Sequence, residues 1–228
     1  MLATDIEAAI ARSVLGRMPP ASVAYVLEDQ PSADIPADTT IYREGEPPRA
    51  LLMVSGLIRM FLMSSEGREV TIKYGRPPDV LGTALIVGGP IDVWAQSLTP
   101  TTIQVIDARR LEEVARRDAI VAFTLAEQLG HRVEELVHQV AINTFGSVKE
   151  RVATQLLELA SSRGRSDGRL VARLSRQELA DAVGSVREVV ARTLRDFRTA
   201  GLVATGSDEV VVLDPAGLFE ESFGARDA

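Results

Sequence analysis

The chain has 228 residues and a formal net charge of −7, with 25% charged and 46% hydrophobic residues. This composition indicates a globular protein that can bury a core as one large domain or two smaller ones. Because there is no cysteine, disulfides, thiolate zinc sites, Cys-ligated iron–sulfur clusters and a cysteine nucleophile are excluded. We recognise no signal peptide and no run of about 18 apolar residues, so we expect a cytoplasmic protein without a membrane partner.

The first half of the chain is predicted to be mainly β-structure. A short amphipathic helix over residues 5–16 precedes Pro19-Pro20. From about residue 35 to 107, short β-branched runs alternate with turns at a spacing of roughly 8–12 residues, which indicates a small antiparallel barrel or sandwich. Gly45 and Gly56 stand where tight corners require a positive φ.

From Asp107 onward the pattern becomes helical. We expect a short helix over residues 108–116 and a long one from the capping residue Asp118 to about Ile142. The long helix carries an apolar stripe that fits pairing with a second copy, although packing against its own barrel is the alternative and both are possible at this length. The stripe consists of Leu125, Leu129, Val133, Leu136 and Val140. Residues 143–147 are the candidate hinge, followed by a helix over residues 148–160.

The charge is distributed unevenly along the chain. Residues 147–205 hold eleven bases and seven acids, a local charge of +4, so that the remainder carries −11. A basic segment joined to an acidic domain is typical of a module that binds a polyanion, although chance clustering on solvated helices explains the same charges.

Two identical capping patterns lie ten residues apart in the basic segment. Ser175-x-x-Glu178 and Ser185-x-x-Glu188 each fit a capping box, in which the serine and the glutamate bond each other's backbone N–H groups. We therefore predict one helix over residues 176–183 and a second over residues 185–200, with Gly184 in the turn between them. Two helices joined by a short glycine turn, followed by the hairpin-forming runs LVAT and VVVL, indicate a winged helix-turn-helix.

The side chains of these two helices suit DNA recognition. An arginine at the start of a groove-entering helix can bond guanine O6 and N7, and a carboxylate beside it can accept from cytosine N4. The residues expected to read bases are Arg187, Glu188 and Arg192, with capping as the alternative role of Glu188. The residues expected to contact the DNA backbone are Ser175, Arg176, Gln177, Ser185 and Arg195, with a solvated face as the alternative for Arg176 and Arg195.

The order of these parts resembles the cyclic-AMP receptor protein/FNR (CRP/FNR) family of bacterial transcription regulators over about residues 35–215. The motifs SRQELA, VG, RE and ARTL, and RVATQLLELA before them, carry the resemblance. It implies an α+β fold with a cupin-like antiparallel β-barrel of the cyclic-nucleotide-binding type (1–117), a long dimerisation helix with a hinge (118–146) and a winged helix-turn-helix (147–228). It also implies a homodimer that binds pseudo-palindromic double-stranded DNA, bends it and recruits or blocks RNA polymerase. Val186 replaces a serine that is usual in the family, which puts one phosphate contact in question.

The cyclic-nucleotide cassette of the family is degenerate in this chain. Members that bind cyclic nucleotide carry Gly-Glu and, later in the cassette, an arginine that neutralises the phosphate. Here Gly82 is present, Thr83 replaces the glutamate, and Asp92 lies at the arginine position, where it would repel a phosphate. Leu136 and Val137 match the hydroxyl-bearing residues that touch the base. We therefore do not expect cyclic AMP to bind in the usual way, and we predict no cofactor and no metal.

Three replacements for cyclic AMP stay open. In the first, side chains fill the pocket and the protein is always competent to bind DNA. In the second, a more apolar ligand binds near Trp94, Leu136 and Val137. In the third, the pocket holds haem or a metal. The only histidines, His131 and His138, are seven residues apart on one helix, and exposed or packed histidines are the simpler explanation.

Two other classes of function fit the sequence less well. A ligand-binding regulatory subunit could use the helix-turn-helix for protein contacts, but the local charge of +4 argues against it. We do not expect an enzyme, because no Ser-His-Asp ordering, P-loop or metal-ligand cluster is found.

Overall fold

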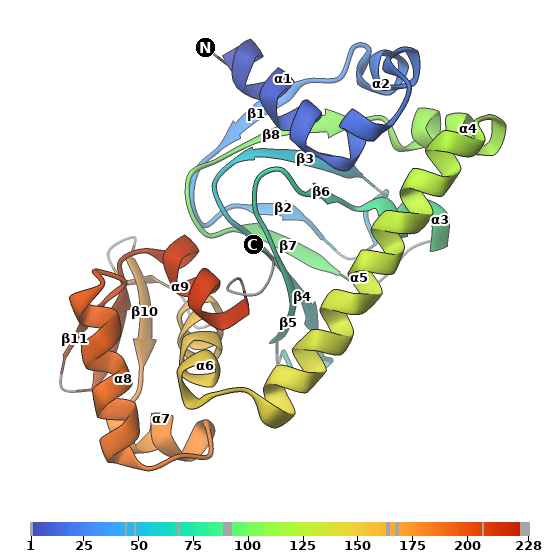
Figure 1. The fold of residues 1–228 in the computed structure, drawn as a ribbon. Helices are drawn as coiled ribbons and strands as arrows, with labels where there is room; N and C mark the ends of the chain where they lie inside the picture. Colours follow the sequence, from blue (N-terminus) through green and yellow to red (C-terminus); the bar gives the residue numbers. More distant parts are fainter. Residues whose placement is uncertain are drawn as a thin grey trace. The chain divides into compact units, whose positions relative to one another are not determined.

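The computed structural model describes residues 2–43, 45–47, 49–67, 69–88, 93–162, 165–166, 169–206 and 208–223. The chain forms two compact units, Met1–Glu135 and Leu136–Ala228, and the boundary between them along the chain falls within the long helix Ala119–Phe145 (Figure 1). The first unit contains α1 (Leu2–Arg12), η1 (Val14–Arg17), α2 (Pro20–Leu27), β1 (Ser32–Ile35), β2 (Thr40–Tyr42), β3 (Ala50–Ser55), β4 (Ile58–Met63), β5 (Glu69–Gly75), β6 (Val80–Leu81), α3 (Thr83–Gly88), β7 (Trp94–Ser97), β8 (Thr101–Ile106), α4 (Ala108–Arg117) and the start of α5 (Ala119–Phe145).

Two antiparallel four-stranded sheets form the β-structure of the first unit. Their strand orders are β1-β8-β3-β6 and β2-β7-β4-β5. An apolar core lies between them, with contributions such as Tyr42 and Ile58 from one sheet and Leu51, Met53 and Ile103 from the other. The expected α+β class is confirmed, and the barrel takes the form of two packed sheets.

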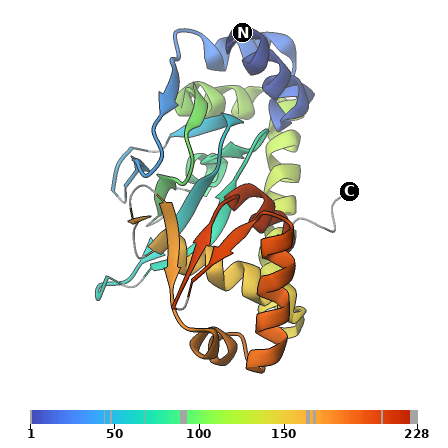
Figure 2. The ribbon, with the colours of Figure 1, turned by 90° about the vertical axis from the view of Figure 1, so that its left-hand side faces the viewer.

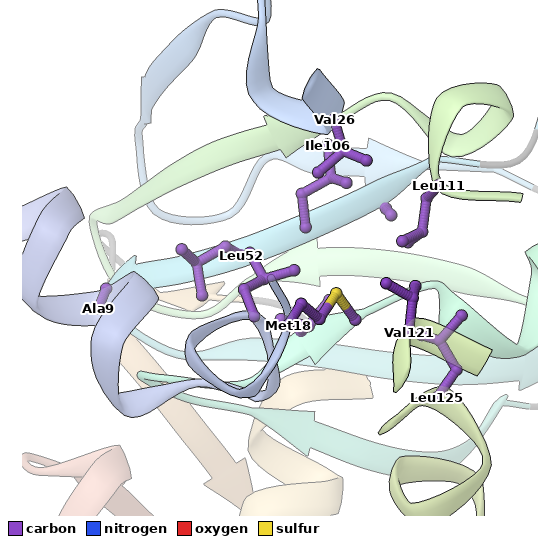
Figure 3. Close-up of a cluster of buried hydrophobic side chains, with 11 residues drawn as sticks. Ala9, Met18, Val26, Leu52, Ile106, Leu111, Val121 and Leu125 are labelled. Atoms are coloured by element: carbon purple, nitrogen blue, oxygen red, sulfur yellow. The ribbon is translucent and has the colours of Figure 1, made fainter. Parts of the chain in front are cut away.

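A second core lies on the outer face of the β1-β8-β3-β6 sheet. Side chains alternate along β3, so that Leu52 points away from the first core and packs under the N-terminal helices (Figure 3). Leu111 of α4 and Val121 and Leu125 of α5 complete this cluster. Each fully buried side chain of this size contributes about 1.5–3 kcal/mol. The start of α5 is thereby fixed to the sheet.

The tight corners of the first unit occur at the expected glycines. Gly45 and Gly56 have φ values of 82° and 86°. At Gly56 a Cβ atom would lie 2.3 Å from Thr101 Oγ1, so a larger residue is excluded by contact as well as by conformation.

The outer stripe of α5 differs from the predicted one. Asp118 caps the helix as expected, because its carboxylate accepts from the Ile120 N–H at 2.8 Å. Leu125, a member of the predicted pairing stripe, is 3% exposed and belongs to the core beside Val121. The alternative role, packing against the chain's own sheet, therefore holds for this part of α5. The exposed side instead presents Phe123, Ala126, Gly130, Val133 and Val137.

The second unit is built around a small sheet. It contains the end of α5, α6 (Val148–Ser162), β9 (Arg165–Ser166), β10 (Arg169–Arg173), α7 (Arg176–Ala182), α8 (Arg187–Thr199), β11 (Val203–Thr205), β12 (Glu209–Val212) and α9 (Pro215–Phe223). The strand order is β11-β12-β10-β9, with the β11–β12 hairpin seen clearly in Figure 2. Helix α6 packs against α8, α9 and β10. Of the described helices, none is both long enough and apolar enough to cross a membrane.

Candidate nucleic-acid interface

The first helix of the pair, α7, begins with the predicted capping box. The Glu178 N–H donates to Ser175 Oγ at 3.2 Å, and the Ser175 N–H donates to the Glu178 carboxylate at 2.7 Å. This backbone hydrogen bond from Ser175 is the main reason why the pKa of Glu178 lies below its ordinary value. The start of α7 is thus fixed by local bonds alone.

The turn to α8 is held by backbone bonds rather than by a second capping box. Gly184 has a φ of 61°, and the Ser185 N–H donates to the Ala180 carbonyl at 2.9 Å. The N-cap of α8 is Val186, which provides no side-chain cap, so the predicted box of Ser185 and Glu188 is wrong. The reason is that Ser185 still belongs to the turn, which moves the start of α8 to Arg187. Capping is therefore removed as an explanation for Glu188.

Helix α8 has one buried and one exposed face. Val190, Thr193, Leu194 and Phe197 are buried in the unit. At 100° per residue, the centre of the opposite face is occupied by Glu188, Arg192, Arg195 and Thr199, all of which are exposed. Arg187 is exposed at the first turn.

The charged side chains at this surface are free of internal partners. Within the described part of the chain, Arg176, Arg187, Glu188, Arg192 and Arg195 form no hydrogen bond or ion pair through their side chains. Of the other two residues expected at the DNA backbone on α7, Ser175 is the cap, and Gln177 donates to Asp181 at 2.8 Å. Four cations and one carboxylate are therefore available to an external ligand.

Two basic residues of the positively charged segment have structural roles that the sequence did not reveal. Lys149 pairs with Glu221 of α9 at 2.6 Å and lies over the Phe197 ring. Arg151 donates to the carbonyls of Gly146 and Val183, and its bond to Val183 spans 2.9 Å. Arg151 thereby ties α6 to the end of α7. The partner helix α9 was not predicted, although Asp214, whose carboxylate accepts from the Gly217 N–H at 3.0 Å, precedes Pro215 as a start signal.

Several of the residues predicted for an effector pocket have structural roles of their own in the first unit. Gly82 has a φ of 87°, and a Cβ atom there would lie 2.0 Å from the Arg49 carbonyl oxygen, so backbone packing alone requires glycine. Thr83 is buried at the start of α3. Trp94 is half-buried on β7 and stacks on Phe61 at 6.2 Å between ring centroids. Asp92 lies outside the described residues.

The helix positions expected near the effector are exposed. Leu136 and Val137 are 41% and 63% exposed. His131 is exposed, with Nδ1 3.4 Å from Glu134 Oε2, and the side chain of His138 lies outside the described part. Among the described residues, no three His, Asp or Glu side chains are grouped as metal ligands.

The junction of α5 with the sheets is instead bridged by the chain's own polar groups, all within the first unit. Arg132 donates to the Ile72 carbonyl of β5 at 2.6 Å, and Gln128 donates to the Val80 carbonyl of β6 at 2.8 Å. Lys73 of β5 pairs with Glu135 at 2.9 Å. Burial disfavours the Glu135 carboxylate, but Lys73 and Arg132 outweigh it and hold its pKa below the ordinary value of 4.5. We call Lys73, Gln128, Arg132 and Glu135 the α5 tether.

Comparison with known proteins identifies both units. The family model of the cyclic nucleotide-binding domain matches residues 33–118, and that of the Crp-like helix-turn-helix domain matches residues 150–221. The transcriptional regulator LdrP of Thermus thermophilus is 34% identical over 194 residues, which cover 83% of this chain and 95% of LdrP. The CRP-like cAMP-activated global transcriptional regulator of Mycobacterium tuberculosis is 28% identical over 204 residues, covering 86% and 89%. The structure of FixK2 from Bradyrhizobium japonicum has a TM-score of 0.53 at 25% identity and covers 87% of this chain and 99% of its own.

Proposed function

The chain belongs to the CRP/FNR family of transcription regulators, and from this premise we propose that it acts as a homodimer that reads pseudo-palindromic DNA with α8. The observation that carries the proposal is the free set of charges on the exposed side of α8. The named relatives are transcriptional regulators, and a helix-turn-helix DNA-binding domain is present in this chain.

The charges on α8 match the groups in a major groove. Arg187 and Arg192 suit guanine O6 and N7, and Glu188 suits the cytosine amino group, now that its carboxylate has no capping role. Arg176 at the start of α7 and Arg195 on α8 suit phosphates, which fix the register of the helix on the duplex. Because the Gln177 side chain already bonds Asp181, Gln177 contributes through its backbone N–H group or after exchange of partners. The N–H of Ser175 is used by Glu178, so Ser175 contributes through its hydroxyl proton.

The exposed stripe of α5 supports a homodimer. Phe123, Ala126, Gly130, Val133 and Val137 follow one another at spacings of three and four residues, which is the pattern of a coiled-coil seam. Gly130 lies in the helix interior, where a Cβ atom would meet nothing within 4 Å, and glycine there costs about 1 kcal/mol relative to alanine. A glycine at this position would allow the α5 helices of two copies to approach each other closely.

Two copies of α8 related by a two-fold axis would read two half-sites of inverted sequence. Dimers of this kind place their recognition helices about 34 Å apart, one turn of DNA, which sets the spacing of the half-sites. RNA polymerase is the expected further partner of the bound dimer.

We further propose that the protein binds DNA without cyclic AMP. The residues do not suit the nucleotide, because Thr83 offers no carboxylate to the ribose, and Leu136 and Val137 offer no hydroxyl to the base. The α5 tether supports the filled-pocket alternative, since protein side chains already join α5 to β5 and β6. A more apolar ligand near Trp94 is the competing possibility, and a compound retained by the purified protein would favour it.

The test is selection of binding sites from random DNA by the full chain, followed by fluorescence anisotropy with and without cyclic AMP. We expect an inverted repeat bound with a steep salt dependence, and no gain in affinity from the nucleotide. Arg187→Ala and Arg192→Ala should each lose about 1–3 kcal/mol and relax one base position. Selection of no sequence would contradict DNA reading and favour a regulatory subunit, whereas micromolar binding of cyclic AMP would contradict only the proposal about the effector.

A further inference from the structure

The residue before the first turn of α8 is an exposed valine. Val186 is 58% exposed, although its backbone is firmly placed. Its φ and ψ are −102° and 150°, and its carbonyl accepts from the N–H groups of Val189 and Val190 at 3.1 and 3.2 Å. The Cβ atom of Val186 is therefore held in place, while most of the residue is exposed to solvent.

A valine is a poor choice for this position on structural grounds. Serine, threonine, asparagine and aspartate are preferred as N-caps because their side chains accept from the first N–H groups of the helix, and valine is among the residues that cannot. Burial does not compensate for the lost cap, because most of the side chain is exposed. Places where a local rule is broken without a structural gain are expected to be functional.

The neighbours of Val186 indicate what it meets. Arg187 and Glu188 follow directly, and both have charged side chains without internal partners in the described part of the chain. In the major groove, the apolar group that a base edge displays is the C5-methyl of thymine. Because valine is branched at Cβ and has few rotamers, it holds its methyl groups in place at little entropic cost.

We propose that Val186 is a specificity-determining residue that contacts the C5-methyl group of one thymine in each half-site. The inference rests on the proposed insertion of α8 into the major groove. At this position the serine that is usual in the family would make a polar contact to the DNA backbone, whereas Val186 would make an apolar contact to a base. This single exchange would therefore alter the sequence preference of the protein.

The experiment removes the methyl group from the DNA. After selection of a binding site with the full chain, each thymine of a half-site is replaced in turn by deoxyuridine, and Kd is measured by fluorescence anisotropy. We expect one thymine per half-site at which loss of the methyl weakens binding about fourfold, the factor that burial of one such group supplies. With both half-sites changed, the loss should reach about fifteenfold.

Protein variants assign the effect to this side chain. Val186→Ser should still bind the selected site but bind the thymine and deoxyuridine duplexes equally. Leu213→Ser, which alters another exposed apolar residue of the same unit, should keep the full difference. The proposal is overturned if no thymine shows the effect or if Val186→Ser retains it, and in both cases the DNA binding itself would still stand. Failure of the parent chain to select any site would refute the proposed function instead.

Discussion

The Nζ atom of Lys73 lies 2.9 Å from Oε2 of Glu135, and this ion pair joins strand β5 to helix α5 across 62 residues of sequence. Arg132 holds the same carboxylate at 2.8 Å while it bonds the Ile72 carbonyl, so the two cations share one acid. Half-exposed pairs of this kind contribute only about 0.2–1 kcal/mol to stability. We expect them to act instead by holding in position the helix that carries the proposed dimer stripe.

Breaking the α5 tether should weaken DNA binding in the absence of any ligand. For Lys73→Met we expect a loss of about twofold to fivefold in affinity, because α5 is less often in the competent position. Anisotropy measures the affinity, and hydrogen exchange over residues 128–137 measures the order of α5.

Arg116→Met provides the matched control for the tether. Its guanidinium pairs with Glu112 at 2.7 Å within α4, so this variant also loses an ion pair with a glutamate, a more exposed one, without touching the tether. Unchanged affinity in Lys73→Met, or an equal loss in Arg116→Met, would show that the tether does not position α5.

Protonation of Glu135 at low pH should break its ion pairs with Lys73 and Arg132. The pKa of Glu135 in the folded protein is below its ordinary value of 4.5, so its contribution is complete above pH 4.5 and is lost as pH falls through the lowered pKa. Thermal unfolding between pH 3 and 7 should therefore show a Tm gap between the parent and Glu135→Gln that narrows as the pH falls below 4.5. Glu112→Gln serves as a control outside the tether, and a gap of constant size for Glu135→Gln would contradict this account.

The sequence predicted those features that depend on local bonds. The capping box of Ser175 and Glu178 was recognised because both partners lie within one helical turn. The equivalent pair at Ser185 failed, since a backbone bond from Ser185 to Ala180 belongs to the turn and is not visible in a residue pattern. Likewise, the roles of Leu125 in the core and of Lys149 against Glu221 depend on packing between distant segments.

The two serines of the repeated pattern should respond differently to alanine. Ser175→Ala removes the hydroxyl oxygen that accepts from the Glu178 N–H, while the backbone N–H of residue 175 can still donate to Glu178, and it should lower the free energy of unfolding by about 1 kcal/mol. Ser185→Ala removes a hydroxyl that caps nothing and should change it by less than about 0.5 kcal/mol. Denaturant unfolding of both variants measures the two changes in the free energy of unfolding. Equal losses would show that Ser185 caps its helix as Ser175 does.

A charge in the exposed stripe of α5 should prevent dimer formation. Val137 is 63% exposed in the single chain, and Val137→Asp would place two carboxylates in the seam of the proposed dimer, where like charges cannot be solvated. Sedimentation equilibrium should show a dimer for the parent and a monomer for the variant. His131→Asp, on an exposed part of the same helix outside the stripe, should remain dimeric. Dimers of Val137→Asp would place the interface elsewhere.

Substitution of a basic residue that has no internal partner should change the salt dependence of DNA binding, whereas substitution of one that is already paired within the protein should not. The slope of log K against log salt falls by about 0.9 for each lost phosphate contact. Arg176 has no internal partner among the described residues, so Arg176→Ala should reduce the slope by about 2 for a dimer and weaken binding on all sequences alike. Lys149 is bound to Glu221 and Phe197, and Lys149→Met should lower Tm while leaving the slope unchanged. Because both variants remove one positive charge per chain, a change of slope in Arg176→Ala alone would separate phosphate contact from net charge, and equal slopes would refute the contact.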